Sequence, residues 1–508
     1  MLFWGKMSER IDFKHTLAMR RNYVGKSCRL HFDASPLKIV RALKQYLYDD
    51  FGNEYLDCIS SVAHVGHCHP HVVSVGQEQM GQLATCCGFL NDSMVDYAKQ
   101  LTETLPENLC VCYFVNSGSE ANDLALRLAH AYTQQSDIIV VDNAYHGNIS
   151  SLIEISPSRL KRLGMEKKDW VHIVAVPDTY RGIFRETVAN PGILYAQEVK
   201  KVVQKIQGKG RKIAALMCEP IMSQAGVIIP PKPYLTEIFR YVREAGGLCI
   251  ADEIQTGLGR TGEKFWGFQT QDVVPDIVTM GKPLGNGYPM AVVVTTKEVS
   301  DSLKEFSSTF GGNPVACAVG KAVLDVIHNE QMMSGAKSVG KCLVDGLRAI
   351  MPTHPMMGDV RGIGLLVGVE IVMDKQSRKP AKEAAEILAY KLKEQKIIIA
   401  NEGPDKNVMI LSPPMCFTCD NARHVVQALD KALQQIENDA SQVGLTSSDD
   451  FPRIESPNSA QVPFNILNDS SLDSSKGTKR EKGDDDDDDD VDDAPDGKKT
   501  CIGYEEMD

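Results

Sequence analysis

The stretch Ile277-Val278-Thr279-Met280-Gly281-Lys282-Pro283-Leu284-Gly285-Asn286-Gly287 joins a short apolar run to a single lysine and a glycine-rich loop. The run at 277–280 predicts a buried strand. A lysine at the end of such a strand needs a partner for its amine or a route to solvent. A desolvated lysine loses its charge more readily and can then act as a nucleophile that forms a Schiff base. Taken alone, Lys282 favours the simpler interpretation, a side chain that reaches solvent.

Length and composition indicate a soluble protein of two or three domains. The chain has 508 residues, of which 43% are hydrophobic and 24% are charged, as in ordinary globular proteins. No apolar run approaches the roughly 18 residues that a membrane span requires. Fourteen cysteines without regular spacing favour reduced thiols. Residues 1–440 contain equal numbers of acidic and basic residues, so no nucleic-acid surface is predicted.

The formal net charge of −12 comes from the C-terminal segment 441–508. This segment is rich in Ser, Asp, Pro and Lys, and Asp484 to Asp490 form an unbroken acidic run. Such a composition buries too little apolar surface to offset the conformational entropy of the chain, which predicts a disordered acidic tail.

A small-residue turn follows the apolar run 109–115, which we interpret as a buried parallel strand. The turn, 116–122, opens a helix with one apolar face. A strand, a turn of this kind and a helix N-terminus together offer free N–H groups to an anion, so Gly118 and Ser119 are candidates to bind a phosphate. Ser119 and Asn122 also suit a helix N-cap, and the two roles are compatible.

Two further predicted strands end in residues that suit a flat ring. The strand 137–141 leads to Tyr145 and His146, and an aromatic side chain there either joins the core or stacks on a bound ring. The strand 248–251 leads directly to Asp252. A carboxylate directed above the sheet from this position can hold a protonated ring nitrogen.

Three other patterns resemble known sites but lack the context. Five residues separate the Gly-x-Gly-x-x-Gly pattern at 257–262 from the strand 248–251, and no helix with a ribose-binding acid follows, so a dinucleotide site is not predicted. The histidines and cysteine of 64–69 are too close in sequence to converge on a tetrahedral metal, and a loop lining a cleft is favoured. The lone Cys-x-x-Cys at 416–419 favours two ordinary thiols. No metal site is predicted.

Alternating strands and helices over 61–328 predict an α/β domain with a mainly parallel sheet. A second run of helices and short strands over 329–440 predicts a smaller α/β domain. We expect the N-terminal segment 1–60, whose strands are joined by turn residues at 50–53, to pack with the small domain.

The turn at Gly118 and Ser119, then Tyr145, Asp252 and Lys282, stand in the order that an enzyme using pyridoxal 5′-phosphate requires. All would lie at the carboxyl ends of strands, where open α/β sheets bind ligands. Lysine is the Schiff-base partner, and the acid keeps the ring nitrogen protonated. Residues 15–437 resemble the class III aminotransferases, which are fold type I pyridoxal-phosphate enzymes. The matching segments are 116–122, 145–147, 252–257, 281–282 and 361–364.

Within that family, the segments 63–70, 177–182 and 413–417 resemble the phospho-lyase branch. The resemblance implies elimination of phosphate from phosphoethanolamine to give acetaldehyde, ammonia and phosphate. The alternatives are a lyase acting on 5-phosphohydroxylysine, an ω-aminotransferase and a non-catalytic binding protein. The segment 86–88 departs from the branch pattern because it lacks a cation expected near the substrate. The resemblance also implies a mitochondrial location, with a cytoplasmic one as the alternative.

The resemblance further implies roles for individual residues. Lys282 and Asp252 would be catalytic, while His146 and Glu219 would lie near the cofactor and Gln255 would contact its ring hydroxyl. A homodimer or homotetramer is implied, in which Thr309 of one subunit reaches the cofactor phosphate of its neighbour. Arg361 is expected to hold the phosphate of a small phosphorylated amine, and a structural ion pair in the small domain is the alternative.

Overall fold

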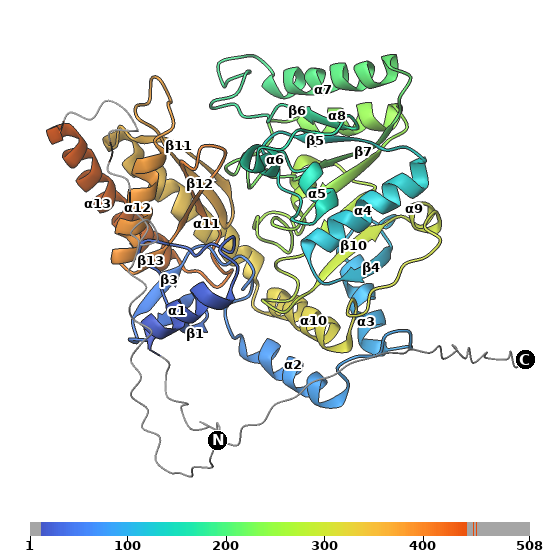
Figure 1. Ribbon diagram of the computed structural model, residues 1–508, viewed down its shortest axis with the longest axis horizontal. Coiled ribbons are helices and arrows are strands. Elements are labelled where there is room, and N and C mark those ends of the chain that lie inside the picture. Colours follow the sequence, from blue (N-terminus) through green and yellow to red (C-terminus); the bar gives the residue numbers. More distant parts are fainter. Residues whose placement is uncertain (1–11, 444–450, 452–453, 455–508) are drawn as a thin grey trace, which may run out of the picture. The chain divides into compact units, whose positions relative to one another are not determined.

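A seven-stranded sheet with the order β4-β10-β9-β8-β7-β5-β6 carries most of the residues predicted to form the site (Figure 1). The computed structural model describes residues 12–443, 451 and 454. The strands of this sheet are β4 (Val111–Val115), β5 (Asp137–Val141), β6 (Val171–Val174), β7 (Ile213–Cys218), β8 (Leu248–Asp252), β9 (Ile277–Met280) and β10 (Ala291–Thr295). Strands β6, β5, β7, β8 and β9 pair in parallel, and β10 is antiparallel to its neighbours. The predicted α/β fold with a mainly parallel sheet is confirmed.

Strand β4 differs from the prediction, because it is not a buried parallel strand. It pairs antiparallel with β10 at the edge of the sheet, and its first three residues are only partly buried. Its continuous apolar pattern has another cause. Phe114 packs against Tyr97, whereas Tyr113 packs against Phe306, with ring centroids 5.9 and 5.4 Å apart. Both faces of this edge strand are therefore covered by aromatic neighbours.

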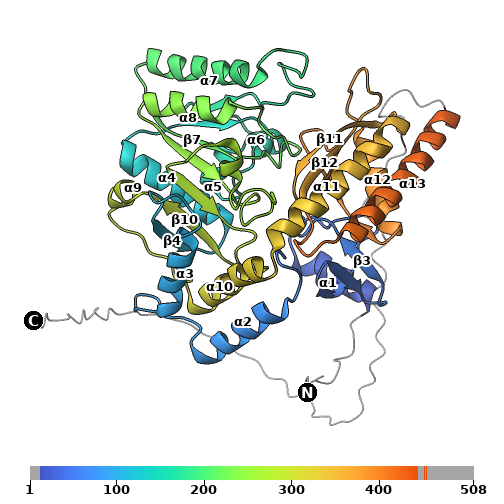
Figure 2. The ribbon, with the colours of Figure 1, turned by 180° about the vertical axis from the view of Figure 1, so that it is seen from behind.

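Alternate residues of the central strands face two separate cores, which is why these strands are apolar throughout. Ala215 and Met217 of β7 pack with α4 (Gly118–Thr133), whereas Leu216 packs with α8 (Tyr234–Glu244) on the other face. Helix α7 (Pro191–Gly208) lies beside α8 (Figure 2). The remaining helices between residues 61 and 328 are α2 (Pro70–Gln82), α3 (Asp92–Thr102), α5 (Ser150–Glu154), α6 (Pro157–Leu163), η1 (Gly267–Gln271), α9 (Lys297–Asp301) and α10 (Pro314–Asn329).

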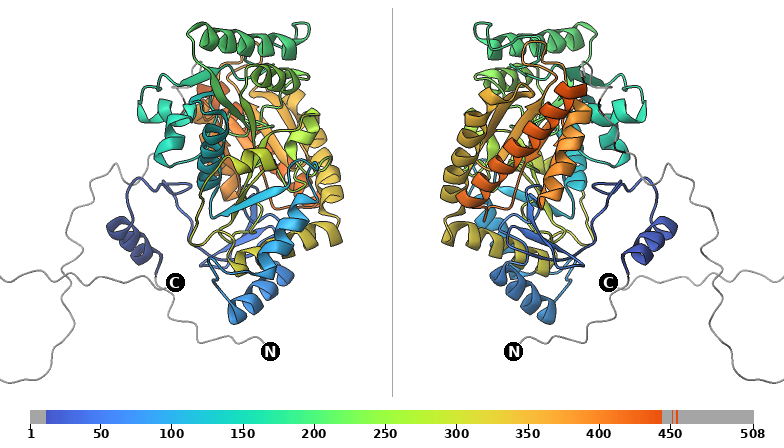
Figure 3. Two further views of the ribbon diagram at one scale, coloured as in Figure 1. Left: turned by 90° about the vertical axis from the view of Figure 1, so that its right-hand side faces the viewer. Right: turned by 90° about the vertical axis from the view of Figure 1, so that its left-hand side faces the viewer.

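The C-terminal part contains an antiparallel sheet in the order β11-β12-β15-β14. Helices α11 and α12 pack against it, and α13 lies beside both helices (Figure 3). The elements of this part are α11 (Met332–Ile350), η2 (Met351–Thr353), β11 (Met357–Ile363), β12 (Leu366–Ile371), α12 (Lys382–Glu394), β13 (Ile397–Ile398), β14 (Ala400–Glu402), β15 (Val408–Leu411) and α13 (Cys419–Val443).

A third sheet, β1-β2-β3-β13, links the N-terminal segment to the C-terminal part. It is preceded by α1 (Phe13–Tyr23) and consists of β1 (Ile39–Leu43), β2 (Tyr46–Asp49), β3 (Glu54–Asp57) and β13. The pairing of β3 with β13 is parallel. The division into domains at 60 and 328 stays a prediction. None of the helices in the described ranges is long and apolar enough to cross a membrane.

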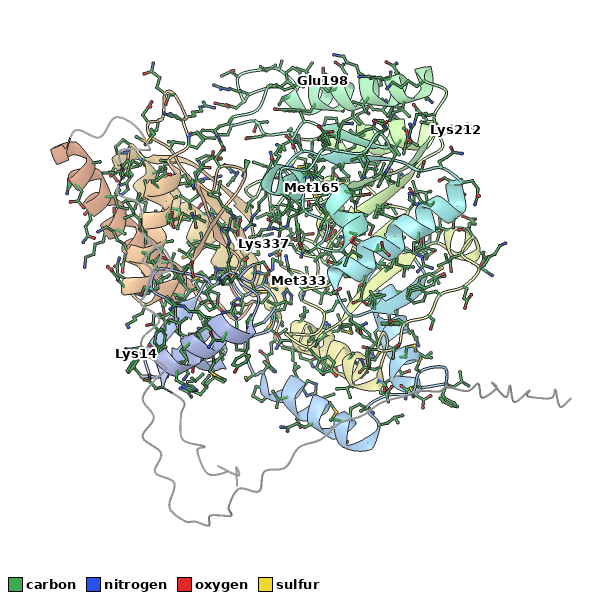
Figure 4. All side chains as sticks on the ribbon, viewed as in Figure 1. Lys14, Met165, Glu198, Lys212, Met333 and Lys337 are labelled. Atoms are coloured by element: carbon green, nitrogen blue, oxygen red, sulfur yellow. The ribbon has the colours of Figure 1, made fainter. Side chains whose placement is uncertain are left out.

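The glycine-rich loop 257–262 packs closely against helix α11. Gly259 and Gly262 have φ values of +77° and +69°, in the left-handed region that favours glycine. A Cβ at these positions would lie 2.4 Å from Met333 Cγ and 2.4 Å from the backbone nitrogen of Lys337. Both residues are labelled on α11 in Figure 4. The glycines therefore allow the loop to approach this helix closely.

The folded structure includes part of the segment 441–508, which the sequence predicts to be a disordered tail. Helix α13 continues to Val443, and Phe451 is 4% exposed and belongs to the main core. The average composition of 441–508 does not reveal this buried aromatic residue. The rest of the predicted disordered segment lies outside the described residues.

Replacing Phe451 with alanine is expected to lower the free energy of unfolding by about 3 kcal/mol, because a buried aromatic side chain is lost and a cavity remains. Urea denaturation of the full chain measures the effect. The matched control is Phe51→Ala, since Phe51 is 82% exposed and its loss is expected to change stability by less than about 0.5 kcal/mol. Equal effects of the two substitutions would contradict the core position of Phe451.

Candidate active site

A cavity of about 170 Å³ lies where the helix N-terminus of α4 meets the carboxyl ends of β5, β7, β8 and β9. The structure brings together eight of the ten predicted site residues in its wall. The cavity is lined by Ser117, Gly118, Ser119, Asn122, Tyr145, His146, Gly147, Glu219, Ser223, Gln224, Asp252, Ile254, Gln255 and Lys282. Parallel strands end at one edge of a sheet, and this geometry makes residues distant in sequence converge.

Asp252 is 3% exposed, and three donors hold its carboxylate at the base of the cavity. Asn122 Nδ2 donates to Oδ2 at 2.9 Å, and the backbone N–H of Ile254 donates to Oδ1 at 3.1 Å. His146 Nδ1 lies 2.8 Å from Oδ2 and is the donor, because a carboxylate only accepts. These hydrogen bonds offset the cost of burying the carboxylate and fix its direction.

Asn122 lines the cavity although the sequence does not predict it as a site residue. The N-cap of α4 is Ser117 and not the predicted Ser119. Ser117 is the N-cap, and its Oγ accepts from the backbone N–H of Glu120 at 3.2 Å. Ser119 Oγ instead accepts from the backbone N–H of Asn148 at 3.1 Å. Asn122 Nδ2 also donates to the backbone oxygen of His146 at 2.7 Å. Asn122 lies four residues after Gly118, and residues at this spacing share a helix face. This spacing is the sequence feature that places Asn122 beside the predicted phosphate site.

The start of α4 fits a phosphate group. The first intrahelical bond joins the backbone N–H of Ala121 to the oxygen of Ser117, so the N–H groups of Gly118 and Ser119 precede the hydrogen-bonded turn. The positive end of the helix dipole lies at the same place. A Cβ on Gly118 would lie 3.0 Å from the side chain of Ile254, which lines the cavity. A larger residue would therefore narrow the site.

Tyr145 and His146 fit a flat, polar ring. The guanidinium carbon of Arg159 lies 4.5 Å from the centroid of the Tyr145 ring and holds it in place through a cation–π contact. His146 is buried, and its Nε2 has no hydrogen-bond partner among the described residues. Unpaired buried polar atoms are uncommon, and here the atom belongs to a cavity wall that a ligand would complete.

Lys282 extends from the end of β9 into the cavity, where its Nζ donates to Gln255 Oε1. The Lys282 side chain is exposed toward the cavity, and the protein atoms that surround its amine partly desolvate it. This desolvation lowers the pKa of Lys282, while the carboxylates of Glu219 and Asp252 act in the opposite direction. Gln255 Nε2 in turn donates to Ser61 Oγ at 3.0 Å.

Glu219 is 6% exposed and has one free oxygen. Its Oε2 accepts from the backbone N–H of Ser223 at 3.0 Å, whereas Oε1 has no hydrogen-bond partner within the described part of the chain. Burial, reinforced by the nearby charge of Asp252, raises the pKa of Glu219 to about 7, against the opposing effects of His146 and Lys282.

Two predicted residues, Thr309 and Arg361, do not line the cavity. Thr309 is exposed on the loop between α9 and α10, and its contact with a neighbouring subunit stays a prediction. Arg361 on β11 pairs with Asp359 at 2.9 Å and with Glu370 at 2.6 Å. Its observed contacts therefore match the ion-pair alternative, and a role in binding substrate stays a prediction.

The histidines of 64–69 have three separate partners. His64 Nε2 lies 2.8 Å from the backbone oxygen of Leu258, and burial next to Arg260 lowers the pKa of His64 to about 3. His67 pairs with Asp57 at 2.7 Å, and His69 pairs with Glu330 at 2.9 Å. Over residues 12–443, 451 and 454, no group of three or more His, Cys, Asp or Glu is arranged to hold a metal ion.

Known proteins of similar sequence and structure cover most of this chain. A family model described as aminotransferase class-III matches residues 31–433. A Drosophila melanogaster protein named alanine–glyoxylate aminotransferase 2-like is 44% identical over 424 residues, with 82% of this chain and 86% of that protein covered. The Caenorhabditis elegans ethanolamine-phosphate phospho-lyase homolog 1 is 39% identical over 434 residues, with 82% and 92% covered. A solved Arthrobacter phospholyase in complex with phosphoethanolamine is 35% identical, with a TM-score of 0.79 and coverage of 82% and 99%.

The raised pKa of Glu219 predicts a pH-dependent cost to stability. The folded chain keeps a proton on Glu219 up to about pH 7, while the unfolded chain releases it near pH 4.3, so the folded state binds more protons between these values. Stability from this group therefore falls as the pH rises through that range. Glu219→Gln removes this fall and is expected to raise the free energy of unfolding of cofactor-free protein at pH 8 by up to about 3 kcal/mol.

Urea denaturation of both proteins at pH 5 and pH 8 measures this effect, because contributions from other groups cancel in the difference between variant and parent. A difference that does not change with pH would contradict the burial of an unpaired Glu219 carboxyl group.

Proposed function

The chain belongs to the class III aminotransferase family, whose cofactor is pyridoxal phosphate, and we propose that it eliminates phosphate from phosphoethanolamine. The reaction consumes water and yields acetaldehyde, ammonia and inorganic phosphate. Two relatives support this substrate, since the Caenorhabditis elegans protein is named for ethanolamine phosphate and the Arthrobacter phospholyase is in complex with phosphoethanolamine.

The cavity offers a partner for each part of the cofactor. The N–H groups of Gly118 and Ser119 would hold its phosphate, Tyr145 would cover its ring, and Asp252 would hold its ring nitrogen. When bound, the cofactor supplies an electron sink that stabilises negative charge on the carbon bearing the substrate amine. The hydrogen bonds that His146 and Asn122 donate to Asp252 keep this carboxylate directed at the cavity.

The observation that carries the proposal is the amine of Lys282, which faces the cavity with a lowered pKa. A lowered pKa increases the fraction of neutral amine, which can accept a proton from carbon. In the proposed reaction, Lys282 Nζ takes the proton from the carbon bearing the substrate amine. The phosphate on the adjacent carbon then leaves with the electron pair of its carbon–oxygen bond. Gln255 orients Nζ through its Oε1.

An ω-aminotransferase is the second candidate, because the Drosophila relative, 44% identical, is named as an aminotransferase. Both reactions begin with the same proton transfer to lysine, so the fate of the substrate distinguishes them. Purified holoenzyme is incubated with phosphoethanolamine, and inorganic phosphate and acetaldehyde are measured. Release of both without a keto acid is expected. Turnover that requires a keto acid would refute the lyase and support the aminotransferase. The same assay with 5-phosphohydroxylysine tests the alternative lyase substrate.

Lys282→Ala is expected to lower phosphate release from phosphoethanolamine at least about a hundredfold, because the base that accepts the proton is lost. The assay is the steady-state rate with saturating substrate and added cofactor. Lys297→Ala is the matched control, since Lys297 is exposed at the start of α9 and does not line the cavity. Retention of phosphate release in the Lys282 variant would contradict the assignment of the base.

The assembly into two or four copies and the mitochondrial location also stay predictions. Thr309 is accessible on the surface of a single chain, which is compatible with the expected contact to a neighbouring cofactor site.

A further inference from the structure

Within the described part of the chain, Arg260 is a fully buried cation that contacts backbone oxygens and a histidine but no carboxylate. Its Nη1 donates to the backbone oxygens of Leu365 at 3.0 Å and Pro413 at 2.8 Å. Its Nη2 donates to the backbone oxygen of Ser61 at 3.4 Å and to His64 Nδ1 at 3.2 Å. Burial lowers the pKa of Arg260 to about 10, so the guanidinium keeps its charge at neutral pH. Buried cations are normally paired with an anion, so an unpaired one points to a role for its charge.

His64 is neutral and leaves the charge of Arg260 uncompensated. A guanidinium only donates hydrogen bonds, so His64 Nδ1 is the acceptor and Nε2 carries the proton. This assignment agrees with the other contact of the ring, because Nε2 lies 2.8 Å from the backbone oxygen of Leu258. Burial, together with the charge of Arg260, lowers the pKa of His64 to about 3. The ring therefore stays neutral at neutral pH.

A chain of hydrogen bonds joins Arg260 to the amine of Lys282. Arg260 Nη2 donates to the backbone oxygen of Ser61, and Ser61 Oγ accepts from Gln255 Nε2 at 3.0 Å. Gln255 Oε1 in turn accepts from Lys282 Nζ. Both ends of the Gln255 amide are occupied, which fixes its orientation toward the lysine. Arg260 also holds two backbone oxygens of the C-terminal part, so Ser61 is held by a group that is itself anchored.

The charge of Arg260 also acts on Lys282. Desolvation lowers the pKa of Lys282, and the Arg260 guanidinium acts in the same direction because like charges repel inside a protein. The acids that face Lys282 act in the opposite direction, and they are Glu219 after β7, Asp252 on β8 and Glu402 on β14. The charge balance at the amine therefore includes a cation that does not line the cavity.

We propose that Arg260 is a positioning residue that keeps the Lys282 amine oriented by Gln255 and favours its neutral form. Arg260 lies outside the cavity wall, so it acts through Ser61 and Gln255 and through its own charge. The inference rests on the proposed function for its catalytic meaning, because Lys282 accepts the proton that begins either candidate reaction. The state of the amine is a property of the chain itself and is measured without turnover.

Acetylation by acetic anhydride reports the neutral form of the Lys282 amine, because a protonated amine is not a nucleophile. The cofactor-free full chain is acetylated briefly between pH 6 and pH 10, and the Lys282 peptide is quantified by mass spectrometry against the exposed Lys297. Arg260→Gln is expected to reduce Lys282 acetylation roughly fivefold at pH 7 and to move its pH profile to higher pH. The two proteins are expected to converge at the alkaline end. A profile identical to that of the parent would overturn the proposal.

Arg260→Lys and Arg348→Gln are the matched comparisons. Arg260→Lys keeps a positive charge at the same place and is expected to give a profile within about twofold of the parent. Arg348 on α11 also donates to a backbone oxygen, that of Val360, at 3.3 and 3.1 Å, but it is not among the charges that act on Lys282. Arg348→Gln is expected to leave the profile unchanged. A shift equal to that of Arg260→Gln would overturn the proposal, since any lost guanidinium would then have the same effect.

Ser61→Ala tests the hydrogen-bond chain, and it decides the proposal if urea denaturation shows that the Arg260 variants do not fold. The substitution removes the acceptor of the Gln255 amide and leaves the buried charge in place. In the holoenzyme it is expected to lower kcat roughly threefold or more, with KM much less affected, because the amine is less well directed. An unchanged kcat would overturn the proposal.

The two measurements also separate this proposal from the proposed function. The kcat of Ser61→Ala is measured for phosphate release, or for transamination if the holoenzyme catalyses that reaction instead. If the holoenzyme releases no phosphate, the lyase fails, but the acetylation profile of the cofactor-free chain still decides the role of Arg260.

Discussion

The buried carboxylate of Asp252 is the constraint on which the arrangement of the site depends. It lies at the end of β8 and accepts hydrogen bonds from Asn122 on α4 and from His146 after β5. Removing either donor would leave the buried carboxylate short of one hydrogen bond, which costs about 1–3 kcal/mol in proteins. The hydrogen bonds therefore fix a helix and a loop relative to the central strand. The N–H groups of Gly118 and Ser119 are placed by the same helix.

The parallel sheet explains why these residues meet. Strands β5, β7, β8 and β9 are buried on both faces, so charged side chains are absent from their interiors and appear where the strands begin or end. The carboxyl ends of parallel strands lie at one edge, and each end contributes one functional side chain. Tyr145, Glu219, Asp252 and Lys282 follow four different strands, yet all line one cavity.

This regularity sets how much of the molecule could be predicted from the sequence. Strand-end residues such as Asp252 and Lys282 were found because an apolar run followed by a polar residue is visible locally. Asn122 was missed because its partner lies 130 residues away, and a local pattern shows only its capping propensity. Edge strand β4 was misassigned because aromatic side chains cover both of its faces. The contacts of Arg361 likewise depend on tertiary packing, which neither periodicity nor spacing reveals.

The two carboxyl groups of the cavity show how surroundings give one residue type different properties. Asp252 accepts hydrogen bonds from three donors, whereas Glu219 accepts one and keeps a free oxygen. Burial raises the pKa of Glu219 to about 7, partly because Asp252 is close. The number of donors that reach each carboxyl group thus distinguishes two acids that line the same cavity. Desolvation lowers the pKa of Lys282 and the charge of Glu219 opposes that shift, so Glu219 influences how readily the lysine accepts a proton.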